Sequence, residues 1–289
     1  MKSSVDKIVN DLEKIKTKIN SFLTDYSSIY RSNEAGSMFI DFEGDYSFRP
    51  LVDGGQYVQD KLFKQANRIF EGIEVLLMES PEHHKTEFLR AKNYVMSVII
   101  QQRSTWKKDI AEVIELTNEQ LSHISTMLTS IFKTTSNVIL IPDTNALYAH
   151  TSIEQWDFSD FTKFKIIITP SVLKDLDRHK IEHRNEEVRK KAVKLINQIK
   201  EFRRRGSLID GVQVKKDKIE LATIAKEPDF TKSFSWLDSS NEDDRLIAET
   251  VEIIRDNAGS VIALITADIN LQNKCEMADL HFIEPPIPS

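Results

Sequence analysis

The feature that most constrains the fold is a change of sequence pattern near residue 137. From there on, short apolar runs alternate with longer segments that show the spacing of amphipathic helices. This alternation is typical of α/β domains, in which helices cover a largely parallel sheet. The strands that we expect are 138–141, 165–169, 212–214, 219–224, 261–265 and 281–283. The helices that we expect are 171–183, 185–204, 243–254 and 269–277.

The preceding half of the chain has a different pattern. Apolar residues recur at helical spacing, with charged residues between them, over 3–24, 58–78, 85–102 and 107–132. The glycine-rich segment 25–55 predicts a long loop with a short hairpin around Tyr46 and Phe48. At 289 residues the chain is long enough for two domains. We therefore expect an all-α helical bundle over 1–135 and an α/β domain over 136–289.

The amino-acid composition limits which cellular compartment and which kinds of metal site we expect. Cys275 is the single cysteine, which excludes an intrachain disulfide and any multi-cysteine metal site, and this is the usage of a reducing cytoplasm. The N-terminus is charged and lacks the apolar region of a signal peptide, and no run of about eighteen apolar residues occurs. We expect a cytoplasmic protein that does not enter a membrane.

Two aspartates directly follow predicted strands. Asp143 comes after the run 138–141, and Asp268 comes after the run 261–265. In open α/β sheets ligands bind at the carboxyl ends of the strands, so these two side chains are candidates for one site. Each also has a structural interpretation, since aspartate at a helix start accepts hydrogen bonds from free backbone amides.

Three further aspartates lie at the predicted helices. Asp175 falls inside 171–183, where it cannot cap and where a solvated surface acid is the ordinary alternative; Asp243 and Asp244 open 243–254 and could cap it. Carboxylates brought within about 4 Å repel each other by about 4 kcal/mol per pair at a surface-like dielectric, so a cluster requires a cation. Oxygen ligands favour Mg²⁺ or Mn²⁺.

Four segments that contain these acids resemble a known family. They are LIPDTN at 140–145, ITPSVLKDLD at 168–177, DDRLIA at 243–248 and ITADINL at 265–271. In this order and at these separations they resemble the four signature segments of PIN-domain nucleases. The resemblance covers about 137–286 and does not extend to the helical half. It implies a five-stranded parallel sheet flanked by helices, one or two Mg²⁺ or Mn²⁺ ions, and an RNA substrate, single-stranded or structured.

The resemblance also implies residue roles. The catalytic metal ligands would be Asp143, Asp175, Asp243 and Asp268. At the third position the register leaves Asp244 open as a ligand, and we favour Asp243 because Leu246 and Ile247 then take the places of the apolar pair that follows. Asp175 stands where the family more often has glutamate, and its shorter reach favours coordination through water. The supporting residues would be Thr144, Asn145, Thr266 and Asn270.

A basic segment follows the second acid. Although the net charge is −6, lysine and arginine dominate 178–205. Because such side chains supply most of the affinity for nucleic acids, the segment predicts a phosphate-binding surface, and a solvated helix face is the alternative. The predicted RNA-binding residues are Arg178, Lys180, Arg184, Arg189, Lys190 and Lys194. Asp175, His179 and His183 share one helical face, which also leaves a zinc site open.

The predicted function is therefore a metal-dependent endoribonuclease that leaves 5′-phosphate and 3′-hydroxyl ends. The helical half would govern homodimerisation, substrate placement or inhibition. One alternative is a toxin or antiviral-defence effector that its helical domain holds in check, with an inhibitor protein as a further partner. Others are a catalytically silent PIN-like module that binds RNA and a structure-specific DNA nuclease.

Overall fold

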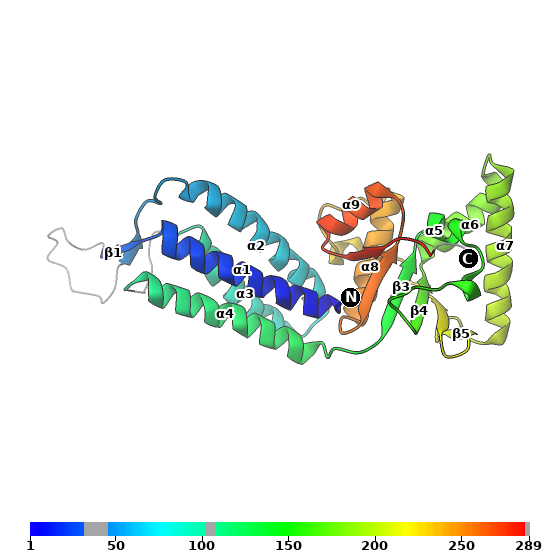
Figure 1. Cartoon of the computed structure of the whole chain (residues 1–289), viewed down its shortest axis with the longest axis horizontal. Helices are drawn as coiled ribbons and strands as arrows, with labels where there is room; N and C mark the ends of the chain where they lie inside the picture. The colour runs from blue at the N-terminus through cyan, green and yellow to red at the C-terminus, as the bar shows by residue number, and fades with distance from the viewer. Residues whose placement is uncertain (32–45, 102–107, 287–289) are drawn as a thin grey trace. The chain divides into compact units, whose positions relative to one another are not determined.

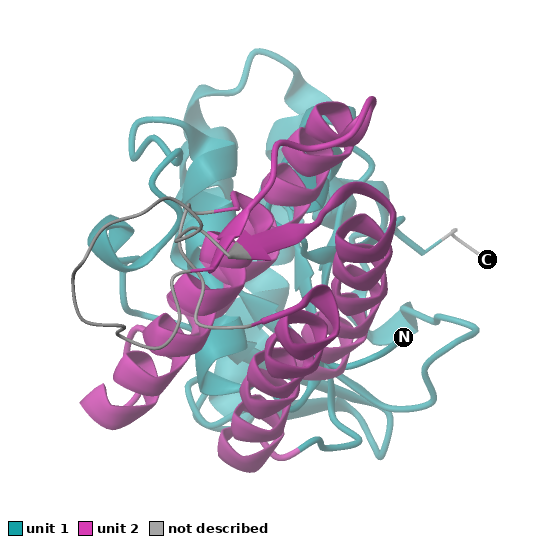
Figure 2. Ribbon diagram, turned by 90° about the vertical axis from the view of Figure 1, so that its left-hand side faces the viewer, with its two compact units in different colours: residues 1–4, 134–289 teal, residues 5–133 magenta. Residues whose placement is uncertain are grey.

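The computed structural model describes residues 1–31, 46–101 and 108–286. The chain divides into two compact units (Figure 2). One comprises Val5–Lys133, and the other comprises Thr134–Ser289 together with Met1–Ser4. Among the helices of the described part, none is long and apolar enough to cross a membrane.

The first unit is helical, as predicted. Its described helices are α1 (Ser4–Tyr26), α2 (Gly55–Leu77), α3 (Glu82–Ile99) and α4 (Ile110–Ile131). Their apolar stripes bury one another, and Phe22, Phe70 and Phe88 are almost fully enclosed. A strand is present at Tyr46 and Phe48 as predicted, but not in a short hairpin: β2 (Tyr46–Phe48) pairs antiparallel with β1 (Ile29–Arg31), and fourteen residues separate the two. Of the long loop predicted over 25–55, residues 32–45 lie outside the described residues.

The second unit contains a six-stranded sheet (Figure 1). Its strands are β3 (Val138–Pro142), β4 (Phe164–Ile168), β5 (Val212–Lys215), β6 (Ile219–Thr223), β7 (Val261–Ile265) and β8 (His281–Ile283). They lie in the order β5-β6-β4-β3-β7-β8, and the last five are parallel to one another. These five form the expected parallel sheet. β5 adds a sixth, antiparallel edge strand, because only three residues connect it to β6 and parallel strands require a long crossover.

Helices cover both faces of this sheet. They are α5 (Thr144–Ala149), α6 (Pro170–Glu182), α7 (Glu186–Arg205), α8 (Glu242–Asp256) and α9 (Ile269–Met277), with 3-10 turns at Ile153–Gln155 and Phe230–Lys232. Figure 1 shows α5, α6 and α7 on one side of the strands and α8 and α9 on the other. Since β3, β4 and β7 each lead directly into a helix, the residues at these three junctions lie along the carboxyl edge of the sheet.

Candidate metal site

Asp143 lies at the junction between β3 and α5. Its Oδ1 accepts a hydrogen bond from the Ala146 amide at 2.5 Å, which caps α5, and its Oδ2 accepts one from the Thr266 hydroxyl at 2.5 Å. The side chain is buried. Burial raises the pKa of Asp143, and the nearby carboxylates of Asp268 and Asp243 raise it further. The capping interpretation is therefore right, and the same carboxylate also has two acidic neighbours.

Thr266 connects Asp143 to Asp268 across neighbouring strands. The fully buried Thr266 hydroxyl donates to Asp143 and accepts a hydrogen bond from the Asp268 amide at 3.0 Å. Asp268 in turn caps α9, because its Oδ1 accepts hydrogen bonds from the amides of Asn270 at 2.7 Å and Leu271 at 3.2 Å. Within the described residues its Oδ2 accepts none. One oxygen of Asp268 is thus available at the edge of the sheet.

Asp175 is held from two sides. Its Oδ2 accepts a hydrogen bond from the Thr144 hydroxyl at 3.2 Å, and its Oδ1 lies 2.8 Å from Nη2 of Arg178. Nη1 of Arg178 lies 2.6 Å from Oε1 of Glu242, so the guanidinium bridges two acids. Burial raises the pKa of Asp175, Glu242 raises it further, and Arg178 opposes both. Sequence reasoning missed Glu242, although it directly precedes the predicted pair of acids.

The adjacent acids Asp243 and Asp244 have different surroundings. Asp244 is buried, and its Oδ2 accepts a hydrogen bond from the Asp238 amide at 2.9 Å, while its Oδ1 lies 2.8 Å from Nζ of Lys274. Asp243 is 39% exposed and lies 3.3 Å from the same ammonium. Neither caps α8, because Asn241 accepts hydrogen bonds from both of their amides. Of the two, Asp243 is the one whose charge raises the pKa of Asp143.

The four predicted supporting residues separate into two pairs. Thr144 and Thr266 form hydrogen bonds to Asp175 and Asp143. The side chains of Asn145 and Asn270 are exposed, and in the described part of the chain neither forms a side-chain hydrogen bond with the acids. The structure therefore brings the two threonines to the acids and leaves the two asparagines at the surface.

The atoms that could bind a metal ion at this site are of the type that hard divalent cations prefer. All the candidate ligands are carboxylate oxygens, and among the described residues Asp143 and Asp268 form no ion pair with any lysine or arginine. Within the same residues no three His, Cys, Asp or Glu side chains converge closely enough to enclose an ion by themselves. Magnesium keeps several of its water ligands in proteins, so a loose group of acids suits it.

The zinc alternative has no support among the described residues, where Asp175, His179 and His183 do not form a group that could hold a metal ion. Nδ1 of His179 lies 2.9 Å from the Tyr148 hydroxyl, and Nδ1 of His183 accepts a hydrogen bond from the Asn185 amide at 3.1 Å. Burial lowers the pKa of His179 and raises that of Tyr148 to about 12. Both imidazoles therefore have hydrogen-bond partners of their own.

A family model described as PIN domain matches residues 140–284, which is half of the chain. The chain belongs to the PIN-domain family. Members of this family are generally nucleases and typically use divalent metal ions, and the matched residues contain all the acids described above. No curated protein matches the chain.

Glu249 is a buried acid of the PIN domain that the sequence did not reveal. Its carboxylate accepts hydrogen bonds from the Ser171 amide at 2.9 Å and the Ser171 hydroxyl at 2.5 Å. Burial raises its pKa, and the hydrogen bonds from Ser171 and Thr169 oppose that shift. Because Glu249 lies on α8 and Ser171 opens α6, this contact fixes the helix of Asp175 to the helix of Asp243.

The basic segment of the PIN domain is largely engaged with its own acids and carbonyls. Arg178 bridges Asp175 and Glu242, Lys180 pairs with Asp177, and Lys190 pairs with Glu186 at 2.8 Å. Arg189 donates to the carbonyls of His183 and Arg184. Arg184 and Lys194 are exposed and form no ion pair with a described residue, and Lys194 lies 3.4 Å from the Ser152 hydroxyl. The last two are the predicted RNA-binding cations with the fewest internal partners.

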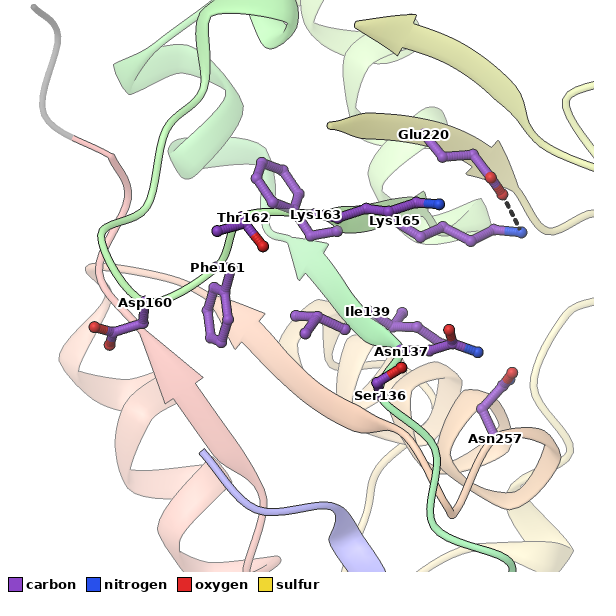
Figure 3. A pocket seen from close by; sticks show the side chains of 12 residues that line it. Ser136, Asn137, Ile139, Asp160, Phe161, Thr162, Lys163, Lys165, Glu220 and Asn257 are labelled. Atoms are coloured by element: carbon purple, nitrogen blue, oxygen red, sulfur yellow. Dashed lines mark ion pairs between the residues drawn. The ribbon is translucent and has the colours of Figure 1, made fainter. Parts of the chain in front are cut away.

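A separate hollow lies at the opposite edge of the PIN-domain sheet (Figure 3). It has a volume of about 590 Å³ and is lined at the amino ends of β3, β4 and β6 by residues that include Asn137, Phe161 and Lys163. An ion pair of 2.8 Å between Lys165 and Glu220 crosses one side. None of the candidate metal ligands lines it, and Asp143 and Asp268 follow the other, carboxyl ends of β3 and β7.

Proposed function

We propose that this PIN domain is a metal-dependent endoribonuclease that hydrolyses RNA phosphodiester bonds and leaves 5′-phosphate and 3′-hydroxyl ends. The observation that carries the proposal is the group formed by Asp143, Asp243 and Asp268, three acids from distant parts of the sequence at one edge of the sheet. Asp143 and Asp268 lack a positive partner among the described residues, so this edge has unbalanced negative charge. A bound Mg²⁺ or Mn²⁺ would balance it.

Each residue has a distinct part in this proposal. When bound, the ion supplies Lewis-acid activation of water and stabilises the charge that develops on the phosphate. Asp143, Asp243 and Asp268 hold the ion, and Thr266 fixes the orientation of Asp143 through its hydroxyl. Asp175 stands beside them, positioned by Thr144 and Arg178, where its reach favours contact through water.

The proposed substrate is RNA, and the proposed cellular compartment is the cytoplasm. RNA is the substrate that the family suggests, and the single cysteine favours a cytoplasmic setting. The role of the helical unit in dimerisation, substrate placement or inhibition stays a prediction, as does an inhibitor protein. A toxin or defence effector would use the same chemistry under a different control.

The test is cleavage of defined RNAs by the purified full-length chain. End-labelled single-stranded and hairpin RNAs are incubated with Mg²⁺, with Mn²⁺ or with EDTA. We expect cleavage with either ion, none with EDTA, and recovery when the ion is restored in excess. The products should be substrates for a ligase that requires 5′-phosphate. RNA that is retained by the protein but never cut under any of these conditions would instead identify a binding module.

The basic segment gives a second prediction, on affinity rather than on catalysis. We expect the double variant Arg184→Gln/Lys194→Gln to bind single-stranded RNA more weakly, because these cations have few internal partners and can contact phosphate. Each lost phosphate contact should reduce the slope of log K against log salt by about 0.7, so the double variant should lose up to about 1.4. Fluorescence anisotropy at several salt concentrations measures the slope.

The matched control for this experiment lies at the opposite edge of the sheet. Lys163 is an exposed lysine that lines the hollow in Figure 3, so Lys163→Gln removes a positive charge without touching α6 or α7. Its slope should equal that of the wild type. Equal slopes for all three proteins would show that the basic segment is a solvated helix face.

A further inference from the structure

The ammonium group of Lys274 lies among oxygen atoms of the kind that a bound metal ion would have as ligands. Its ammonium Nζ lies 2.8 Å from Oδ1 of Asp244, 3.3 Å from Oδ2 of Asp243 and 3.1 Å from Oδ1 of Asn241. Three oxygens from the start of α8 therefore surround one positive charge that comes from α9. Carboxylate and amide oxygens are also the ligands that hard divalent cations take.

The ammonium of Lys274 is held in place because its side chain and that of Asp244 are largely enclosed by the protein. The lysine side chain is 24% exposed and that of Asp244 is 9% exposed, so release of the ammonium would leave a carboxylate unpaired inside the protein. Arg178, which bridges Asp175 and Glu242, is more exposed at 43%, and Glu242 is exposed at 57%. Of these two cations, Lys274 is the one that the protein encloses.

Positive charge is distributed unevenly along the acidic edge. Asp175 has Arg178 as its partner, and Asp243 and Asp244 share Lys274. Asp143 and Asp268 form no ion pair with a described residue, and their carboxylates accept hydrogen bonds only from a hydroxyl and backbone amides. Within the described ranges, the acids of this edge that lack a positive partner are therefore Asp143 and Asp268.

We propose that Lys274 is a built-in counter-ion that takes the place of a second metal ion. The centre then binds a single divalent ion, held by Asp143 and Asp268 and completed by Asp243, whose Oδ1 accepts no hydrogen bond from a described residue. Asp244 serves Lys274 rather than the metal. This inference rests on the proposed function, since it specifies how many ions bind at the same site. Lys274 acts there as a positioning residue and does not contact the substrate.

The test counts bound Mn²⁺ directly on the full-length protein. Electron paramagnetic resonance and isothermal titration calorimetry should give one Mn²⁺ per wild-type chain, with no spectral sign of two coupled ions. Lys274→Gln removes the charge and keeps a side chain that can hydrogen-bond, so two Mn²⁺ should bind, the second between Asp243 and Asp244. Lys274→Arg retains the charge and should bind one.

The controls separate this inference from a merely structural role for Lys274. Lys226→Gln removes another lysine of the unit, one that lies 3.7 Å from Glu252, and should leave one bound ion. Two ions on the wild type, or one ion on a folded Lys274→Gln, would overturn the counter-ion role while leaving the nuclease proposal intact. If circular dichroism shows that Lys274→Gln does not fold, the wild-type protein alone decides the inference. It should then bind one Mn²⁺ and show no spectral sign of two coupled ions. Absence of any Mn²⁺ binding that depends on Asp143 would overturn both proposals.

Discussion

Asp143→Asn is expected to remove metal-dependent RNA cleavage while leaving the PIN domain folded. The substitution takes a negative charge from the group that also contains Asp243 and Asp268, and it weakens the oxygen ligand at the centre of that group. Loss of an outer partner of a metal site typically costs about 10–100-fold in activity or metal affinity, so loss of a central ligand should exceed about 100-fold.

The fold should tolerate this change for a local reason. Asparagine caps helices as well as aspartate does, so its Oδ1 can still accept the hydrogen bond from the Ala146 amide, while its Nδ2 cannot accept the one from the Thr266 hydroxyl. Burial and two neighbouring carboxylates raise the pKa of Asp143, which shows that its charged form is disfavoured where it lies. Loss of the acceptor for the buried Thr266 hydroxyl costs about 1–3 kcal/mol, so the free energy of unfolding should fall by no more than about 3 kcal/mol.

The measurement is single-turnover cleavage together with Mn²⁺ titration and thermal unfolding. Asp157→Asn is the matched control, because Asp157 is 71% exposed and pairs with Lys218 at the turn between β5 and β6, away from the carboxyl edge. Its cleavage rate should equal that of the wild type. An active Asp143→Asn protein would show that the acidic group is a scaffold and would move the function to RNA binding.

The sequence predicted the acidic edge because that edge depends on local features. Asp143 and Asp268 follow strands, and parallel strands necessarily bring their carboxyl ends together. Six strands and the long helices were also predictable, since the strands are short runs rich in apolar residues and the helices have apolar residues at helical spacing. By contrast, α5 was indicated only by the capping interpretation of Asp143, because six residues are too few for helical periodicity to show.

The partners of the acids could not be predicted in the same way. Lys274 lies thirty residues from Asp244, and Glu249 and Ser171 come from different helices, so only the folded chain brings each pair together. The antiparallel direction of β5 depends on the short turn before β6, which the strand pattern does not reveal. Periodicity predicts which face of an element is buried, and it does not predict which polar groups meet across elements.

The adjacent residues Asp243 and Asp244 show most clearly that sequence periodicity does not predict polar contacts between elements. They also give the second prediction with a large expected effect. The register of the family segment left both residues open as ligands, whereas the structure distinguishes them by burial. We expect Asp243→Ala to lose cleavage by more than about 100-fold, because it removes a proposed metal ligand whose charge raises the pKa of Asp143. Its stability should change by no more than about 0.5 kcal/mol, as is usual at a surface position.

Asp244→Ala is expected to act mainly through stability. It leaves the Asp238 amide without its acceptor and the enclosed ammonium of Lys274 without its nearest carboxylate. Loss of one partner of a buried ion pair costs about 3–5 kcal/mol, and because Lys274 is partly exposed we expect about 2–3 kcal/mol. Urea unfolding followed by tryptophan fluorescence, to which the buried Trp156 contributes, measures this loss.

The two variants are each other's control, because they remove the same carboxylate from neighbouring positions of α8. At a temperature where both are folded, Asp244→Ala should retain far more cleavage activity than Asp243→Ala. The reverse pattern, with a stable but inactive Asp244→Ala, would make Asp244 the third ligand. Lys274 would then have to leave Asp244 when metal binds, and its enclosure between the two helices argues against that movement.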